Sequence, residues 1–341
     1  MKHRIQMSTE RTRQSNFELL RIIAMLFIVY YHLIIYFVQP VEKISNSFFS
    51  AIQLTLHTGV LLFVLISGYF GIKPSIRGGI KLLLMTFVYY VPTQVLYDYS
   101  QGSPVGNIIN DFLFISHSPY WFIRTYLMFY VFVPIVNKFL ESSSNKAQVR
   151  VLVALAIINF WFGCIASGDN SLIDGKNIVN FTFLYIAGHF IRDYSPIWQK
   201  MKLRLLVAIY LSINIFLICG RILLDNNIGE KILTRLSFGY NSPLLLLNAM
   251  ALFLCIGKIK FSSKRVNRIS ASMFAVYLIT EQPVIREKVI DNLFNTYLSD
   301  IGSTWGLSLG MLAMTIALIT VCVLIDNIFR PLWNTTKLLS N

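Results

Sequence analysis

The chain has 341 residues, of which 55% are hydrophobic and only 13% are charged, about half the charged share of an ordinary soluble domain. One water-soluble core cannot bury that much apolar surface. The composition therefore predicts an all-α integral membrane protein and excludes a disordered chain or a disulfide-stabilised secreted module. The net charge of +14 is spread between apolar segments, as the positive-inside rule produces, so we expect no nucleic-acid partner.

Ten apolar segments are candidates to cross the hydrocarbon layer, which takes about 20 residues. In chain order they are 17–38, 51–71, 80–97, 120–138, 150–167, 178–192, 203–223, 239–257, 269–285 and 303–325. The sixth segment is short, and the ninth contains Glu281. The four cysteines lie inside apolar runs without metal-ligand spacing, so we expect neither a disulfide nor a metal site.

The distribution of charge tests this count of spans. With a cytoplasmic N-terminus, the inner segments hold 22 Lys and Arg residues against 5 Asp and Glu, whereas the outer loops hold 7 against 10. Adding or removing one span would reverse the side assigned to every later loop and would mix the basic-rich segments with the acidic ones. The pattern therefore predicts ten transmembrane helices with both termini cytoplasmic, in a multi-pass protein of the cell membrane. No Gly/Ser/Pro-rich linker interrupts the sequence, which predicts a single membrane domain over residues 1–341.

Ionisable side chains inside a membrane span are costly and are candidates for function. Arg21 and His32 in the first span are eleven residues apart, and eleven steps of about 100° return to within roughly 20° of the starting direction. We therefore expect both side chains on one face, with Glu18 on the same stripe and able to pair with Arg21. The alternatives are a positive-inside anchor for Arg21 and a structural, hydrogen-bonded role for His32.

Two further titratable residues are expected at the depth of His32. His57 lies roughly 9 Å below the outer end of the second span, as His32 does in the first. The ninth span runs outward and places Glu281 in the same layer, so three helices can bring these groups together. His57 could instead cap an interfacial turn. Ser67 of the second span falls in the inner layer with Arg21.

The second inner segment carries Arg77 and Lys81, which are four residues apart and share a helix face. Together they could hold the phosphates of a cytosolic ligand. Positive-inside anchoring is the alternative reading of both residues.

The first span resembles acyltransferase family 3, whose members are integral membrane acyltransferases. The hallmark of that family is a basic residue followed by a histidine eleven positions later, usually with an acid three residues before the basic one. Glu18, Arg21 and His32 match it, although Ile22 stands where glycine is usual. Residues 60–70 are similar to the second-span signature of the family.

Two later segments extend the resemblance to residue 282. Tyr120, Trp121 and Phe122, followed by Tyr126, Pro134 and Asn137, are similar to the fourth-span pattern of members that modify bacterial surface polysaccharides. Residues 276–281 resemble the late "YLIHE" segment, with Thr280 in place of the commoner histidine, which puts any role of that histidine in doubt for this chain.

The resemblance implies a transferase that moves an acyl group, commonly acetyl, to a hydroxyl of a cell-envelope carbohydrate. It implies acyl-CoA, in particular acetyl-CoA, as the donor substrate and no permanently bound cofactor. The partners would be a glycan or glycolipid acceptor and membrane lipid, in the cytoplasmic membrane of a bacterium. A transporter or flippase for a lipid-linked glycan is the alternative function, although transporters often show paired repeats and matching halves are not evident in this sequence.

Acyl transfer needs a base for the acceptor hydroxyl and stabilisation of the oxyanion. His32 is the expected catalytic residue, acting as a base or carrying the acyl group itself, and Glu281 or His57 could orient its ring. The donor would be bound by Arg21 and Glu18 with Arg77, Lys81 and Ser67. Substrate binding is assigned to Tyr120, Trp121 and Arg124, for which an interfacial aromatic belt is the alternative reading of the two aromatic residues.

Overall fold

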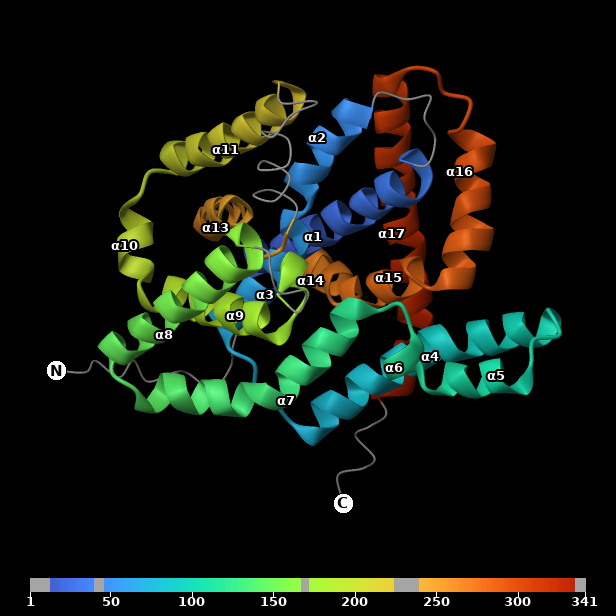
Figure 1. The fold of residues 1–341 in the computed structure, drawn as a ribbon, viewed down its shortest axis with the longest axis horizontal. Coiled ribbons are helices and arrows are strands. Elements are labelled where there is room, and N and C mark those ends of the chain that lie inside the picture. Colours follow the sequence, from blue (N-terminus) through green and yellow to red (C-terminus); the bar gives the residue numbers. More distant parts are fainter. Residues whose placement is uncertain (1–12, 40–45, 167–171, 224–238, 335–341) are drawn as a thin grey trace.

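The computed structural model describes residues 13–39, 46–166, 172–223 and 239–334. Within these ranges the chain is helical and has no strand (Figure 1). The first half comprises α1 (Ser15–Leu33), η1 (Ile34–Val38), α2 (Asn46–Leu56), α3 (Thr58–Phe70), α4 (Ile76–Ser100), α5 (Val105–Phe112), α6 (Phe114–His117), α7 (Trp121–Ser142), α8 (Asn145–Ile157) and η2 (Ile158–Ile165). The second half comprises η3 (Ile173–Gly175), α9 (Ile178–Asp193), α10 (Ser195–Lys200), α11 (Leu203–Leu223), α13 (Pro243–Lys258), α14 (Lys264–Ser270), α15 (Met273–Thr280), η4 (Ile285–Ile290), α16 (Asp291–Tyr297) and α17 (Thr304–Asn334).

Seven helices among the described residues are long and apolar enough to cross a membrane. They are Ser15–Val38, Phe48–Phe70, Ile76–Ser100, Trp121–Ser142, Asn145–Ile165, Leu203–Gly220 and Thr304–Trp333. Each overlaps one of the ten predicted spans, which confirms a helical protein with several membrane spans. The count of ten and the cytoplasmic position of both termini stay predictions.

The other three predicted spans form shorter helices. The sixth and eighth become α9 and α13, each of 16 residues. The ninth is not one continuous helix, because α15 ends at Thr280 and the chain continues through a turn into the π-helical η4. Pro283 follows this turn and has no amide hydrogen to continue the helix. A broken helix is tolerated at membrane depth where protein buries it, and Glu281 at the break is only 8% exposed.

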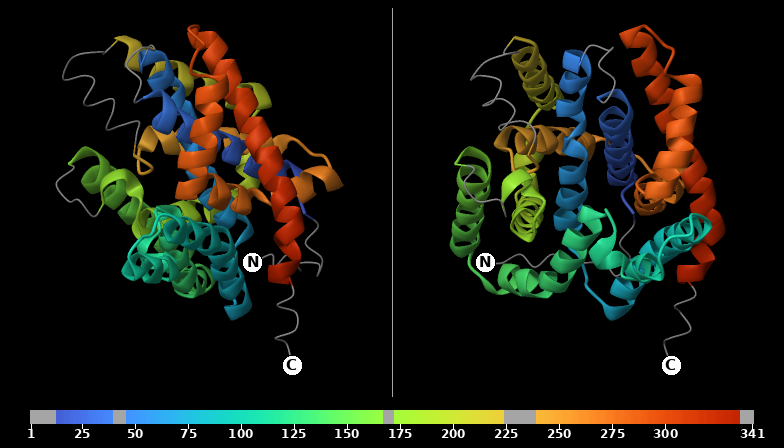
Figure 2. Two further views of the ribbon diagram at one scale, coloured as in Figure 1. Left: turned by 90° about the vertical axis from the view of Figure 1, so that its right-hand side faces the viewer. Right: turned by 45° about the vertical axis from the view of Figure 1, so that its right-hand side comes forward.

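Helices α1 and α3 lie in the middle of the molecule (Figure 1). α1 contacts α3, α13, α14, α15 and α17, while α3 also packs closely against α9. Figure 2 shows α17 running along one side of the molecule, with the shorter α16 beside it. The central position of α1 gives its ionisable residues neighbours from several other helices.

The crossing of α3 and α9 depends on two glycines. A Cβ on Gly68 would collide with the backbone of Tyr185, and a Cβ on Gly188 would collide with the backbone of Leu65. Small residues at such a crossing let two helix backbones approach closely, as in other membrane helix pairs. The crossing fixes α3, which carries Ser67 into the candidate site.

Candidate active site

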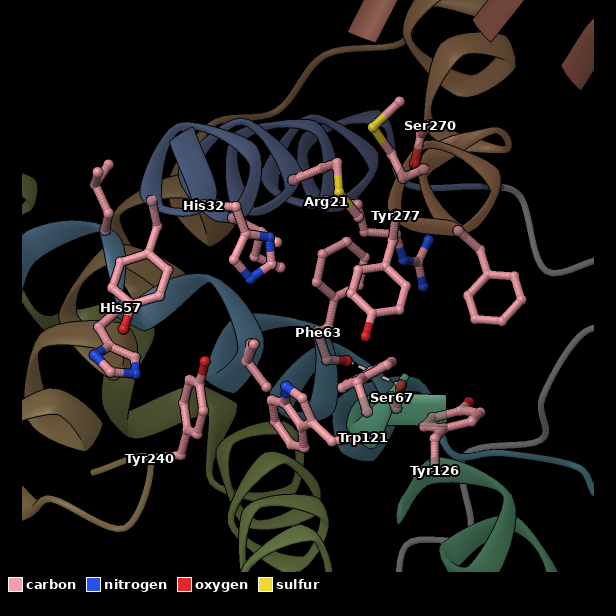
Figure 3. Close-up of a pocket in the computed structure, with 18 of the residues that line it drawn as sticks. Arg21, His32, His57, Phe63, Ser67, Trp121, Tyr126, Tyr240, Ser270 and Tyr277 are labelled. Atoms are coloured by element: carbon pink, nitrogen blue, oxygen red, sulfur yellow. Dashed lines mark hydrogen bonds between the residues drawn. The ribbon is translucent and has the colours of Figure 1, made fainter. Parts of the chain in front are cut away.

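A cavity of about 280 Å³ contains both of the residues that the helical spacing places on one face of α1. Arg21 and His32 line this cavity, and Figure 3 shows both side chains pointing into it. Ser67 and His57 also line it. The predicted common direction of Arg21 and His32 is therefore confirmed.

Glu18 holds Arg21 in place. Its buried carboxylate accepts a hydrogen bond from the Arg21 guanidinium at 2.6 Å and a second from the Ser270 hydroxyl, also at 2.6 Å. The predicted pairing of Glu18 with Arg21 is confirmed. Because Ser270 is the last residue of α14, the same carboxylate also fastens α14 to α1.

His32 is in contact with Glu281. Its Nδ1 lies 2.8 Å from Glu281 Oε1, and the hydroxyl of Tyr36 donates to Glu281 Oε2 at 3.0 Å. The Arg286 guanidinium lies 4.4 Å from the centre of the Tyr36 ring. Two π-helical segments adjoin this group, since η1 begins directly after α1 and η4 carries Arg286. Such segments are frequent at functional sites because they redirect side chains within a helix.

His57 lines the same cavity as His32. It occupies the single-residue turn between α2 and α3 and is 6% exposed. The centre of the Tyr31 ring lies 4.8 Å from that of the His57 ring and 5.8 Å from that of the His32 ring, so the tyrosine packs against both histidines. Of the two residues proposed to orient His32, Glu281 is the one in contact with it.

The three residues assigned to the acceptor have different positions. Trp121 lines the cavity, where its ring stacks on that of Tyr240 at 5.2 Å. Tyr120 does not line this cavity, because its side chain is fully buried and its hydroxyl donates to the carbonyl of Leu278. Arg124 lies outside the lining of the cavity, and its guanidinium donates to a backbone carbonyl at the end of α6.

A second cavity, of about 620 Å³, opens beyond the Arg21 end of the first, and every charged residue among its lining is basic. These residues are Arg13, Lys81, Lys264, Arg268 and Arg330. Leu82, Ala271 and Phe274 line both cavities, so the two are adjacent. Of the two residues of the second inner segment that were assigned to the donor, Lys81 lines the second cavity, whereas Arg77 is exposed outside the lining of either cavity.

Sequence reasoning missed most of the cavity wall. Tyr31, Tyr126, Tyr240 and Tyr277 all line it. Tyr126 and Tyr277 fall in the two later segments of the family resemblance but were not assigned to the site, and nothing in the local sequence distinguishes Tyr31 and Tyr240 among the 17 tyrosines of the chain. The basic residues of α14 contribute to the positive-inside pattern, and nothing else in the sequence assigns them to a binding site. Thr280 turns its hydroxyl to the Val276 carbonyl of its own helix and lines an apolar groove against α17 instead of the His32 cavity.

The site holds one histidine and one carboxylate in contact. Among the described residues, no group of three or more His, Cys, Asp or Glu side chains could hold a metal ion. A histidine held by a carboxylate, in a cavity that adjoins a basic one, is suited to proton transfer at a substrate that carries negative charge.

Comparison with known proteins gives the family. A family model described as an acyltransferase domain matches residues 14–327. No curated protein and no solved structure gave a match. The matched range covers nearly the whole chain. It contains the lining of the first cavity, the His32–Glu281 pair and the lining of the second cavity except Arg13, Arg330 and Trp333. The chain therefore belongs to acyltransferase family 3 and is an acyltransferase of the membrane.

Proposed function

We propose that this protein transfers an acetyl group from acetyl-CoA to a hydroxyl of a cell-surface or lipid-linked glycan. The observation that carries the proposal is the adjacency of the basic cavity to the cavity of His32, through the shared residues Leu82, Ala271 and Phe274. A donor with phosphates at one end and a thioester at the other can occupy both cavities at once.

The basic cavity suits the phosphate-bearing end of coenzyme A. Charge-assisted hydrogen bonds from Arg and Lys are the strongest that phosphate oxygens receive. Arg330 is paired with Asp326 at 2.6 Å, so Arg268 and Lys264 of α14 are the better candidates for phosphate contacts. Arg21 lies between this cavity and His32, where its guanidinium can contact the thioester-bearing arm.

His32 is placed to act as the base. Glu281 is next to Nδ1, which leaves Nε2 as the nitrogen that can accept a proton from the acceptor. As that proton is transferred, the acceptor oxygen forms a bond with the thioester carbonyl. The carbon–sulfur bond then breaks, and CoA leaves as the thiol with the proton from His32. In the covalent alternative, His32 takes the acetyl group first and passes it to the hydroxyl.

The first cavity also supports a short acyl group. About 280 Å³ is near the lower end of the roughly 300–1,000 Å³ found for ligand pockets. The space must accommodate the thiol-bearing arm of the donor and part of the acceptor. A long acyl chain would fill the region that the acceptor hydroxyl must reach.

The experiment is an acetyl-CoA titration of purified protein, following acceptor-dependent CoA release. The double variant Lys264→Gln/Arg268→Gln is compared with Arg265→Gln, an exposed residue of the same helix outside the cavity lining. Loss of charge-assisted contacts should raise the Michaelis constant for acetyl-CoA at least about tenfold in the double variant. The constant should be unchanged in the control. Equal constants in both variants would reject the donor site.

A further inference from the structure

Two segments that are distant in the sequence, residues 172–177 and 239–242, are fastened together beside the His32 cavity. The amide of Tyr240, which lines the cavity, donates to the carbonyl of Asp174 at 2.9 Å. The side chain of Asn180 is 1% exposed and donates to one carbonyl in each segment, at 3.0 and 3.1 Å. A buried amide therefore holds the rim of the cavity in one conformation.

The backbone of this rim is strained. Asp174 has a φ of 62°, a left-handed conformation that residues other than glycine rarely adopt. Such a conformation persists where surrounding bonds over-determine it, and it is concentrated at ligand sites. The carbonyl of Lys176 accepts a hydrogen bond from the Thr125 hydroxyl at 3.2 Å, which fixes the other end of the turn. The rim thus presents two side chains from a fixed backbone, Asp174 and Lys176.

Lys176 is placed at the mouth of the cavity. Its Nζ lies 5.6 Å from the centre of the Trp121 ring, which lines the cavity. Its ion pair with Asp174 is long, at 3.8 Å, and the lysine side chain is 46% exposed, so solvent screens the pair and it stabilises little. The ammonium group can therefore exchange this partner for a ligand at small cost.

We propose that Lys176 binds an anionic group of the acceptor, a carboxylate or a phosphate, while the acceptor sugar lies against the wall of Trp121 and Tyr240. The inference rests on the proposed function and adds the charge of the substrate to it. Lysine acts as a compact point charge with rotatable donors. It therefore favours anionic ligands and can bind either a carboxylate or a phosphate, although the two groups differ in geometry.

The charge pattern of the chain supports this assignment. The predicted outer loops hold 7 Lys and Arg residues against 10 Asp and Glu, so their net charge is negative. A cation kept at the cavity mouth attracts an anionic acceptor to the one place where its hydroxyl can reach His32. The acidic residues of the outer loops have the same sign of charge as the acceptor. They therefore weaken its binding elsewhere on this side of the protein, which improves selectivity for the site of Lys176.

The experiment uses membranes from cells that make the protein, which contain its natural acceptor, and radiolabelled acetyl-CoA. The wild type is compared with Lys176→Gln, Lys176→Arg and Lys288→Gln. Lys288 is the matched control, because it also lies over an aromatic ring, that of Tyr97 at 5.8 Å, but outside the cavity lining. Labelled product is separated on an anion exchanger before and after mild acid and phosphatase treatment.

We expect Lys176→Gln to lower the labelling rate at limiting acceptor about tenfold, since a hydrogen bond to a charged group is lost. Lys176→Arg should retain most of the rate, and Lys288→Gln should retain all of it. The Michaelis constant for acetyl-CoA should be the same in the four proteins. Loss of retention after phosphatase treatment identifies a phosphate monoester, and retention of the product identifies a carboxylate or a phosphodiester.

A labelled product that is neutral at every stage would overturn the inference and leave the acetyltransferase function intact. A normal rate in Lys176→Gln with an anionic product would also overturn it. If the wild type incorporates no label into any glycan, the proposed function itself fails, and the inference fails with it.

Discussion

At the scale of single residues, His32 is the side chain on which the proposed chemistry depends. We predict that His32→Asn, which retains a donor at the position of Nδ1 for Glu281 but cannot serve as the base, yields folded protein with very low activity. A positioned general base typically contributes about 10²–10⁴-fold in rate. Activity is measured per amount of monodisperse, detergent-extracted protein, so that a loss of folding is not read as a loss of catalysis.

A structural His32 would behave differently. Its replacement would lower the yield of monodisperse protein while the specific activity of the surviving fraction stayed near normal. Trapping an acetyl group on His32 with the donor alone would keep the residue as catalytic and replace the base route with the covalent one.

Tyr36 is a positioning residue in this scheme, because its hydroxyl fixes the Glu281 oxygen that does not contact His32. Tyr36→Phe should lower kcat about tenfold, the effect of losing one hydrogen bond to a charged group, while the Michaelis constant for acetyl-CoA stays unchanged. Tyr30→Phe is the matched control, since its hydroxyl bonds Ser308 on α17 instead. Equal kcat values in the two variants would show that Tyr36 has no part in orienting the pair.

What the sequence predicts at this scale depends on whether two residues share a helix. The spacing of Glu18, Arg21 and His32 was sufficient because all three lie on α1, whose geometry is regular. Lys176 and Tyr240 reach the same site from segments far along the chain, and no local periodicity relates them to α1. Tyr120 and Trp121 are neighbours in the sequence, but only Trp121 lines the cavity, because adjacency in the sequence does not tell which of two side chains faces a cavity.

At the scale of helices, the crossing of α3 and α9 is a sharp test of packing. Gly68→Ala and Gly188→Ala each place a methyl group against the backbone of the other helix, and overpacking of this kind costs about 1–3 kcal/mol. Thermal unfolding in detergent should show a lower midpoint for both variants. Gly106→Ala on α5 is the control, because a Cβ there meets open space.

An unchanged midpoint in both α3–α9 variants, measured beside the control, would show that the two helices can separate freely. Hydropathy located these helices but could not show how they cross. It also predicted one continuous ninth span, since averaging over about 20 residues hides a break caused by a single proline. Glu281, a candidate catalytic residue, lies at this break. Hydropathy therefore predicted the wrong local structure at a residue of the candidate site.

At the scale of the whole molecule, the proposed reaction fixes the orientation in the membrane. Acetyl-CoA is a cytosolic metabolite, so the basic cavity must open to the cytoplasm and the rim that carries Lys176 must face the other side. This is the orientation that the charge pattern predicts independently.

We predict that, in a Cys219→Ser background, Lys260→Cys reacts with a membrane-impermeant maleimide only after cells are permeabilised, whereas Asn107→Cys reacts in intact cells. Cys219 is replaced because it is the exposed one of the four native thiols, which all lie within the described residues. Labelling of Lys260→Cys in intact cells would place the basic cavity outside the cell. Acetyl-CoA could then not reach it, and the donor would have to be a molecule available on that side.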